Sequence, residues 1–328
     1  MKRSIILLSA LLLALSGCQT IDAVGVLVPP TVDQDANLPS VSIRVAGVQR
    51  KVHVRTFGNA ANPVLFLLHG SYSDSRPYRN LCEGLAQKYF VVSWDQRGCG
   101  LSERITAEEF SLQSAVEEIQ QMKSIYAPNR TVTLLGQSWG GGPATQYTAE
   151  FPANVAQLVL LEPIPLTGSD MLEVYASIIE FSYLNPSWNS LAQHSQALSP
   201  SGHEQLDYRA RMILSSTMTA GYHCDGENPP AWNVHRVGGF VEYRRNLTLG
   251  DPIQGFKYDF TNGIRNFAEP VLILGGSCSS LGFAVQSKYT KPHFRQAQVV
   301  EIRNAGHRMN IEQYDAVMAA LRGYLRAY

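Results

Sequence analysis

Residues 132–142 constrain the fold of this chain more than any other stretch. They read Val-Thr-Leu-Leu-Gly-Gln-Ser-Trp-Gly-Gly-Gly, an apolar run rich in β-formers that stops at a glycine, presents Ser138 and leads into a predicted helix over 143–151. Glycine stands two residues before and two residues after the serine, as a strand-to-helix turn too tight for neighbouring side chains requires. We therefore expect Ser138 above a sheet edge at a helix N-terminus, where backbone N–H groups favour a developing negative charge.

A chain of this length contains this pentapeptide by chance about one time in ten, so the surrounding pattern has to support it. That pattern alternates apolar strands with helices, which predicts βαβ units and a mostly parallel sheet with its site at the carboxyl ends of the strands. The expected strands cover 41–45, 51–57, 63–68, 90–94, 132–136, 155–161, 271–274 and 298–302, and the expected helices cover 78–88, 112–126, 143–151 and 311–325.

The alternation stops between residues 166 and 263. This stretch shows helical patterns over 171–183, 204–218 and 237–247, broken by proline and glycine, and no convincing strand. We interpret residues 167–263 as a helical cap inserted between the sixth and seventh strands of a core formed by 40–166 and 264–328.

The N-terminus is typical of a targeting segment. Lys2 and Arg3 precede an apolar run over 5–15 that is too short to span a bilayer comfortably. The sequence Leu-Ser-Gly-Cys that ends at Cys18 resembles the bacterial lipobox. The resemblance implies a signal peptide over 1–17, a lipidated Cys18, a tether over 18–39 and, from Gln19, attachment to the periplasmic face of the outer membrane. The alternative is an ordinary signal peptide or signal anchor with an incidental cysteine.

Composition excludes one class of partner. The formal net charge is zero, with 45% hydrophobic and 16% charged residues, so no basic excess exists to bind nucleic acid. In an oxidising compartment the other cysteines could form up to two disulfides, with three possible connectivities. Their spacing matches no zinc motif; these cysteines are Cys82, Cys99, Cys224 and Cys278.

Four motifs together resemble the α/β-hydrolase superfamily, and most of all its prolyl iminopeptidase-like branch. They are His-Gly-Ser at 69–71, Asp-Gln-Arg-Gly-Cys-Gly-Leu-Ser at 95–102, Gly-Gln-Ser-Trp-Gly at 136–140 and Asn-Ala-Gly-His at 304–307. The resemblance implies a mostly parallel eight-stranded sheet flanked by helices, with the cap between strands 6 and 7. The chain departs from that branch at the oxyanion loop, where His-Gly-Ser-Tyr replaces a longer motif rich in glycine and proline.

The predicted catalytic centre has Ser138 as nucleophile and His307 as base. A serine hydroxyl needs a base within hydrogen-bond reach, and His307 follows the last strand, at the same sheet edge. The resemblance implies that the backbone N–H groups of Ser71 and Trp139 form the oxyanion hole. Four further residues are expected to support the loops beside it more than to react: His69, Gly70, Asp95 and Arg97. Other histidines, including 194, 203, 223, 235 and 293, are expected to be surface or core residues.

The acid of the triad is the open position. In the superfamily it usually follows the seventh strand, but residues 276–280 read Gly-Ser-Cys-Ser-Ser and hold no carboxylate. Ser279 could not balance an imidazolium charge. We favour Glu162, at the end of the sixth strand, where some α/β-hydrolases carry their acid. The alternative is Asp225 or Glu227 of the cap, held by a Cys224–Cys278 disulfide.

The predicted activity is two-step acyl transfer on a small ester, amide or peptide, with no metal or organic cofactor. An aminopeptidase like the prolyl iminopeptidases and an esterase both fit, and C–C bond hydrolysis or perhydrolysis could use the same triad. A non-catalytic binding lipoprotein is the alternative from another class. In prolyl iminopeptidases cap acids hold the free amine of the substrate, and four glutamates of this cap are candidates: Glu173, Glu180, Glu204 and Glu242.

Overall fold

The structure is a computed structural model that describes residues 29–179, 203–204, 206–207, 210, 222–225 and 233–327. The predicted signal peptide and the lipidation residue Cys18 lie outside the described residues, as do the cap candidates Glu180 and Glu227 and the histidine at 194. Within the described residues, no helix combines the length and the apolar character needed to cross a membrane.

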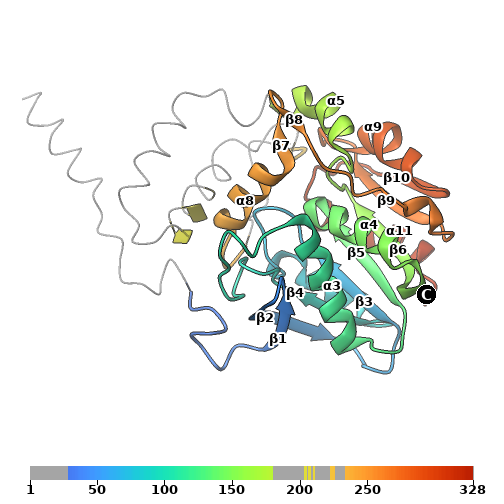
Figure 1. Ribbon diagram of the computed structural model, residues 1–328. Coiled ribbons are helices and arrows are strands. Elements are labelled where there is room, and N and C mark those ends of the chain that lie inside the picture. The colour runs from blue at the N-terminus through green and yellow to red at the C-terminus, as the bar shows by residue number, and fades with distance from the viewer. Residues whose placement is uncertain are drawn as a thin grey trace, which may run out of the picture.

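An eight-stranded sheet forms the centre of the molecule (Figure 1). Its order is β1-β2-β4-β3-β5-β6-β9-β10, antiparallel between β1, β2 and β4 and parallel from β4 onward. The strands are β1 (Ser40–Val45), β2 (Val48–Phe57), β3 (Val64–Leu68), β4 (Phe90–Trp94), β5 (Val132–Gln137), β6 (Val155–Leu161), β9 (Val271–Gly276) and β10 (Ala297–Ile302). The predicted α/β-hydrolase fold is confirmed.

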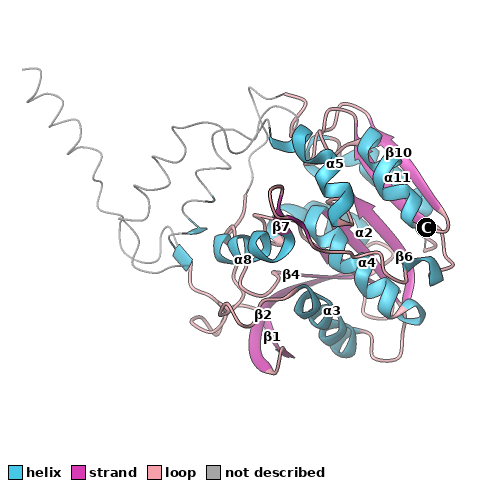
Figure 2. Ribbon diagram, turned by 45° about the horizontal axis from the view of Figure 1, so that its top comes forward, coloured by secondary structure: helices cyan, strands magenta, loops and turns pink. Residues whose placement is uncertain are grey.

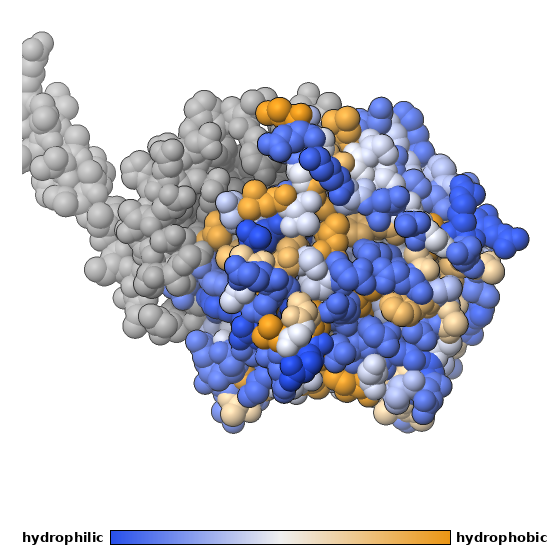
Figure 3. All heavy atoms as spheres, viewed as in Figure 1, coloured by the Kyte–Doolittle hydropathy of each residue, from blue (hydrophilic) through white to orange (hydrophobic). Residues whose placement is uncertain are grey.

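Helices cover both faces of this sheet, which explains why the central strands are apolar on both sides (Figures 1 and 2). One buried cluster joins one face of the sheet to α3 (Leu112–Tyr126) and α4 (Gly141–Glu150). A second cluster joins the other face to α2 (Arg79–Leu85) and α11 (Tyr314–Tyr324). Polar residues cover most of the surface over α3 and α4 (Figure 3), as expected for helices that bury one side.

Short helical elements complete the core. Residues 311–325, predicted as one helix, form α10 (Met309–Glu312) and α11, separated at Gln313, whose φ of −138° is not helical. The other short elements are η1 (Arg76–Tyr78), η2 (Ser138–Gly140), η3 (Pro152–Asn154), η4 (Ile264–Asn266), α9 (Phe283–Val285), η5 (Gln286–Thr290) and η6 (Lys291–His293).

The described part of the cap contains helices α5 (Gly168–Ile179) and α8 (Gly239–Leu249), and both lie between β6 and β9 in the chain. It also contains a small hairpin, β7 (Gly250–Asp251) and β8 (Gly255–Phe256), so the prediction of a cap without strands was wrong. Strands of two residues are too short to show an alternating pattern. The glycines at 250 and 255, both with positive φ, mark the hairpin instead.

The folded body begins within the predicted tether. Thr31 and Val32 are buried, and the Val32 N–H donates to the Leu101 carbonyl at 2.9 Å. From the cap side, Arg236 Nη2 donates to the carbonyl of Pro29 at 2.9 Å. Residues 29–32 therefore contact both the core and the cap.

Backbone strain gathers at the carboxyl edge of the sheet. Among the described residues, five that are not glycine have positive φ, and Ala46 is the one that lies away from this edge, in the β1–β2 turn. The other four follow strands β3, β5, β6 and β10: Tyr72 (52°), Ser138 (51°), Glu162 (40°) and Asn304 (54°). Side chains rarely adopt such angles, and clusters of them are typical of functional sites.

Candidate active site

Ser138 stands on the turn between β5 and α4, preceded by Gln137 and followed by Trp139. A Cβ at Gly136 would lie 2.5 Å from the carbonyl oxygen of Gly140, and one at Gly140 would lie 2.5 Å from that of Leu68. No side chain fits at either distance. The structure therefore requires both glycines of the predicted turn, and it leaves Ser138 only 7% exposed.

His307 and Glu162 form a buried pair at the same edge of the sheet. The Nδ1 atom of His307 lies 2.6 Å from Glu162 Oε2, and the two side chains are 3% and 0% exposed. The other carboxylate oxygen, Oε1, accepts the Gly276 N–H at 2.6 Å. The structure thus brings the favoured acid against the predicted base.

Ser279 occupies the stretch where the superfamily usually carries its acid. Its hydroxyl donates to Glu162 Oε2 at 2.7 Å. The serine at this place therefore forms a hydrogen bond to the carboxylate that follows the neighbouring strand β6. The alternative acid from the cap is not needed for His307, because Glu162 already holds Nδ1, and Asp225 is exposed. The Cys224–Cys278 disulfide considered with that alternative is present, and Cys82 and Cys99 are buried free thiols.

Gln137 lies against the second nitrogen of the base, a contact that the sequence analysis did not foresee. The amide nitrogen of Gln137 is 3.2 Å from His307 Nε2, and its Oε1 accepts the Tyr78 hydroxyl at 2.7 Å. Because Nδ1–H of His307 donates to Glu162, Nε2 is free to accept this amide proton. Ser138 Oγ makes no hydrogen bond to the described residues, so the predicted serine–histidine bond is not formed in this arrangement. Such bonds often tighten only with substrate.

Residues 222–225 of the cap form a strap over His307. The backbone N–H of His307 donates to the Tyr222 carbonyl at 2.7 Å, and the two rings lie 4.8 Å apart. The disulfide from Cys224 and an ion pair between His223 and Glu312 attach the strap to the core. The strap is thus joined both to the base and to the core.

His69 supports the loop after β3 as a neutral ring. Burial lowers its pKa to about 4. Its Nε2 accepts the backbone N–H of Gln96 at 3.0 Å, while Nδ1 donates to the Gly70 carbonyl at 2.8 Å. Gln96 lies in the loop after β4 and in turn accepts the indole N–H of Trp139 at 3.2 Å. The loop after β3 is therefore joined through Gln96 to the serine turn. A Cβ at Gly70 would lie 2.3 Å from Gln137 Oε1, so this glycine makes room for Gln137.

Asp95 holds the loop after β4 through saturated hydrogen bonding. Its carboxylate accepts from His53 Nδ1 at 3.0 Å and from the N–H groups of Ser75 and Leu101, each at 2.8 Å. Burial by itself would raise the pKa of Asp95, but these bonds and the charge of His53 outweigh it and hold the pKa well below its usual range.

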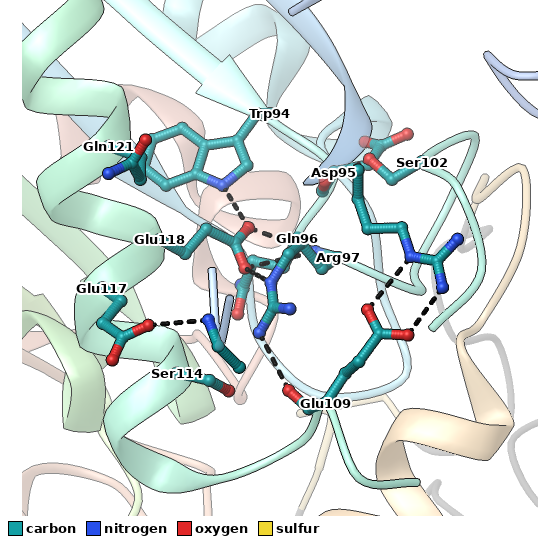
Figure 4. Close-up of polar contacts among 12 residues, drawn as sticks. Trp94, Asp95, Gln96, Arg97, Ser102, Glu109, Ser114, Glu117, Glu118 and Gln121 are labelled. Carbon is teal, nitrogen blue, oxygen red and sulfur yellow. Dashed lines mark hydrogen bonds and ion pairs between the residues drawn. The ribbon is translucent and has the colours of Figure 1, made fainter. Parts of the chain in front are cut away.

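Arg97 points toward Glu118 of α3 (Figure 4). Its Nε donates to Glu118 Oε2 at 3.2 Å and its Nη2 to the Glu109 carbonyl at 3.3 Å. The other oxygen of Glu118 accepts the Trp94 indole N–H at 2.8 Å. These contacts agree with the predicted support of the loop.

The two predicted oxyanion donors are both contacted by the cap. The N–H groups of Ser71 and Trp139 make no hydrogen bond within the described part of the chain. Arg245 of α8 donates from Nη1 to Ser71 Oγ at 2.8 Å, and its guanidinium lies 3.9 Å above the Trp139 ring. Glu242 pairs with Arg245 and accepts the Tyr72 N–H at 2.9 Å. The sequence analysis missed Arg245, for which the three-residue spacing from Glu242 on one helix was the available signal.

The remaining cap candidates for amine binding differ from Glu242. Glu173 is exposed, and Glu204 lies 3.7 Å from Arg104. A cavity of about 540 Å³ lies beside the oxyanion loop, among α5, α8 and the β7–β8 hairpin. Tyr72 and Glu242 line the side of the cavity that borders this loop.

Comparison with known proteins agrees with this architecture. The sequence profile of the alpha/beta hydrolase fold matches residues 63–314. The chain is 22% identical over 303 residues to the proline iminopeptidase PfmaB of Pestalotiopsis fici, which covers 83% of this chain and 94% of that protein. It is 26% identical over 225 residues to the proline iminopeptidase of Clostridium botulinum, covering 65% and 72% respectively.

Two solved structures show the same fold at low identity. VinJ superposes with a TM-score of 0.62 at 16% identity, over 87% of this chain and 97% of that one. A membrane phospholipase A described as a bacterial virulence factor superposes with a TM-score of 0.60 at 18% identity, over 98% and 99%.

Proposed function

The chain belongs to the alpha/beta hydrolase fold family, and on that premise we propose that it is a serine hydrolase with Ser138, His307 and Glu162 as its triad. The observation that carries the proposal is the buried contact of 2.6 Å between His307 Nδ1 and Glu162, at the edge where Ser138 stands in strained conformation. The acid holds the ring in the tautomer whose Nε2 can accept a proton.

In the proposed reaction Ser138 Oγ attacks the substrate carbonyl while its proton passes to His307 Nε2. For this step the Gln137 amide gives up Nε2 to the serine hydroxyl. Glu162 stabilises the imidazolium, and the N–H groups of Ser71 and Trp139 hold the oxyanion. His307 then protonates the leaving group, and a water molecule activated by the same base releases the acyl group from Ser138.

We propose an ester as the preferred substrate. Binding a free amine in the cap needs a carboxylate that is not already neutralised, and Glu242 is paired with Arg245 and with the Tyr72 N–H. Aminopeptidase activity is the second candidate, favoured by the similarity to two proline iminopeptidases. The non-catalytic alternative rested on the absence of an acid after the seventh strand. Because Glu162 lies against His307, that absence no longer favours a protein without activity.

The activity is tested with a fluorophosphonate probe, which phosphonylates an activated serine. The wild-type protein should be labelled, and Ser138→Ala should not. Hydrolysis of short- and long-chain p-nitrophenyl esters should exceed that of proline p-nitroanilide. A protein whose Ser138→Ala variant is labelled as well as wild type would contradict the proposed nucleophile, and faster cleavage of the anilide would favour the peptidase.

We also propose that Cys18 carries the lipid anchor, which would place the enzyme on the periplasmic face of the outer membrane. Lipidation at this residue would supply the several acyl chains that stable attachment needs. Metabolic labelling with an alkyne fatty acid in a Gram-negative host should mark the wild-type protein and leave Cys18→Ala unmarked. Equal labelling of both would reject the lipobox interpretation.

A further inference from the structure

We infer that the cap helix α8 completes the oxyanion hole, with Glu242 and Arg245 as positioning residues for the backbone that binds the oxyanion. The inference rests on the proposed serine hydrolase activity and concerns the same site. Both side chains are buried, at 3% and 2% exposure, and both point from the cap to the loop after β3.

Glu242 fixes the backbone of that loop at its most strained residue. Tyr72 has a φ of 52°, a left-handed conformation that residues with a side chain rarely adopt. Its N–H donates to Glu242 Oε1 at 2.9 Å. This bond fixes the plane of the Ser71–Tyr72 peptide. It thereby restricts the backbone dihedral angles of Ser71, which set the direction of the predicted donor N–H.

Arg245 joins the two halves of the predicted hole. Its Nη1 donates to Ser71 Oγ at 2.8 Å, and its planar cation lies over Trp139 at 3.9 Å. Glu242 accepts from the same nitrogen, which keeps the guanidinium in place. The Nε atom is buried and has no hydrogen-bond partner among the residues that the structure describes. The packing on Trp139 and the contacts of Nη1 therefore explain the position of this side chain. A lysine could not provide the flat stacking surface and the bond at once.

These contacts compensate for the short oxyanion loop of this chain. The loop reads His-Gly-Ser-Tyr, with a single glycine, and it takes part of its rigidity from side chains of the cap. The hole is therefore complete only while α8 is seated on the core. The cavity beside Glu242 is also lined by α8, so a substrate bound there contacts the helix that orients the donors.

The kinetic test compares Arg245→Ala and Glu242→Leu with Arg244→Ala, a matched control on the same helix. The first two variants should lower kcat for p-nitrophenyl esters about ten- to hundred-fold, less than the loss of an oxyanion donor itself costs at most. The apparent pKa of the base should stay as in wild type in both variants, because the His307–Glu162 pair is not altered. KM should stay as in wild type for Arg245→Ala, since Glu242 lines the cavity and Arg245 does not. Glu242→Gln keeps an acceptor for the Tyr72 N–H and should lose less than Glu242→Leu.

Chemical rescue separates positioning from general destabilisation. Guanidinium at sub-denaturing concentration should restore part of the kcat of Arg245→Ala and should not change that of Arg244→Ala. Wild-type kcat in Arg245→Ala and Glu242→Leu would overturn the inference, as would an equal loss in the Arg244→Ala control.

A second measurement decides the inference even if no substrate is found. In a Ser138→Ala background, the Arg245→Ala and Glu242→Leu changes should speed amide hydrogen exchange in peptides covering 69–73 by about an order of magnitude. Arg244→Ala should not. Unchanged exchange would overturn the inference, while an unlabelled wild-type protein with faster exchange in the variants would reject only the proposed activity.

Discussion

Two histidine–carboxylate pairs of this protein look alike and occupy different settings. His307 lies 2.6 Å from Glu162 and His53 lies 3.0 Å from Asp95, and in each pair both side chains are at most 3% exposed. A serine hydroxyl also bonds each carboxylate, from Ser279 in one case and Ser75 in the other. By burial and distance alone the pairs could not be told apart.

The two pairs differ in where the histidine stands along the backbone and in what its second ring nitrogen, the one that does not face the carboxylate, can contact. His53 lies inside β2, and its pair closes a network that holds the loop after β4. His307 lies on a loop after β10, and its Nε2 points to Gln137, next to Ser138. A buried pair becomes a candidate for catalysis when one nitrogen faces a partner that can be exchanged for a nucleophile.

The largest expected effect comes from removing the charge of each acid in turn. Glu162→Gln should lower kcat about 10³- to 10⁴-fold, because an amide cannot stabilise the imidazolium. Asp95→Asn should change kcat only a few-fold and should cost about 3–5 kcal/mol of unfolding free energy, because it breaks a buried pair that holds the loop. Ester turnover and denaturant unfolding of both variants measure this. Near-normal turnover in Glu162→Gln would break the comparison.

A smaller effect tests whether Ser279 marks the usual place of the acid. Since its hydroxyl lies 2.7 Å from Glu162 Oε2, Ser279→Asp in the Glu162→Gln background should recover turnover about tenfold or more. Ser280→Asp in the same background is the control and should recover nothing. Equal recovery by both would show that any nearby negative charge suffices.

His307 lies on a loop and is held in part by the strap, whereas His53 is held by the strand β2 in which it lies. Replacing Cys224 and Cys278 by alanine should lower turnover about threefold and should cost about 4 kcal/mol of unfolding free energy by loop entropy, since the cysteines are 54 residues apart. Reductant should affect the wild-type protein in the same direction and leave the double variant unchanged. A reductant effect on the double variant would contradict this assignment, because Cys82 and Cys99 are already free thiols.

The smallest expected effect on turnover concerns Asp74, next to Asp95. Burial and the charge of Asp95 raise the pKa of Asp74 to about 8, from 3.8 in its ordinary state. The folded state therefore binds more protons between these pH values, so the free energy of unfolding should fall as pH rises from about 4 to 8 and level off above. Asp74→Asn should reduce this fall in the free energy of unfolding by ~1 kcal/mol or more between pH 5 and 8.5, without changing kcat. Denaturant titrations at pH 5 and 8.5 check it, and an unchanged slope would assign the effect elsewhere.

The sequence predicted those site residues that follow a strand of the sheet. Ser138, Glu162 and His307 each follow a strand of a parallel sheet, so chain order alone places them at one edge. The predicted donors Ser71 and Trp139 came instead from the resemblance to the α/β-hydrolases.

The contacts between side chains of distant segments could not be predicted. Arg245 and Ser71 are 174 positions apart, and nothing in the local pattern of either residue indicates the other. The contact of Gln137 with His307 depends on a choice of rotamer, and the strap depends on which cysteines pair. Spacing and periodicity report the burial of an element and say little about which polar atoms meet across it.

The four strained residues at the sheet edge have a consequence for anyone who evolves this protein in the laboratory. Glycine at Tyr72 or Asn304 would relieve the backbone and return up to about 1 kcal/mol at each position. A screen for heat resistance alone should therefore enrich glycine at these two positions. The selected variants should be more stable and should have lower turnover. Only a screen that scores heat resistance and turnover together would keep the native residues there.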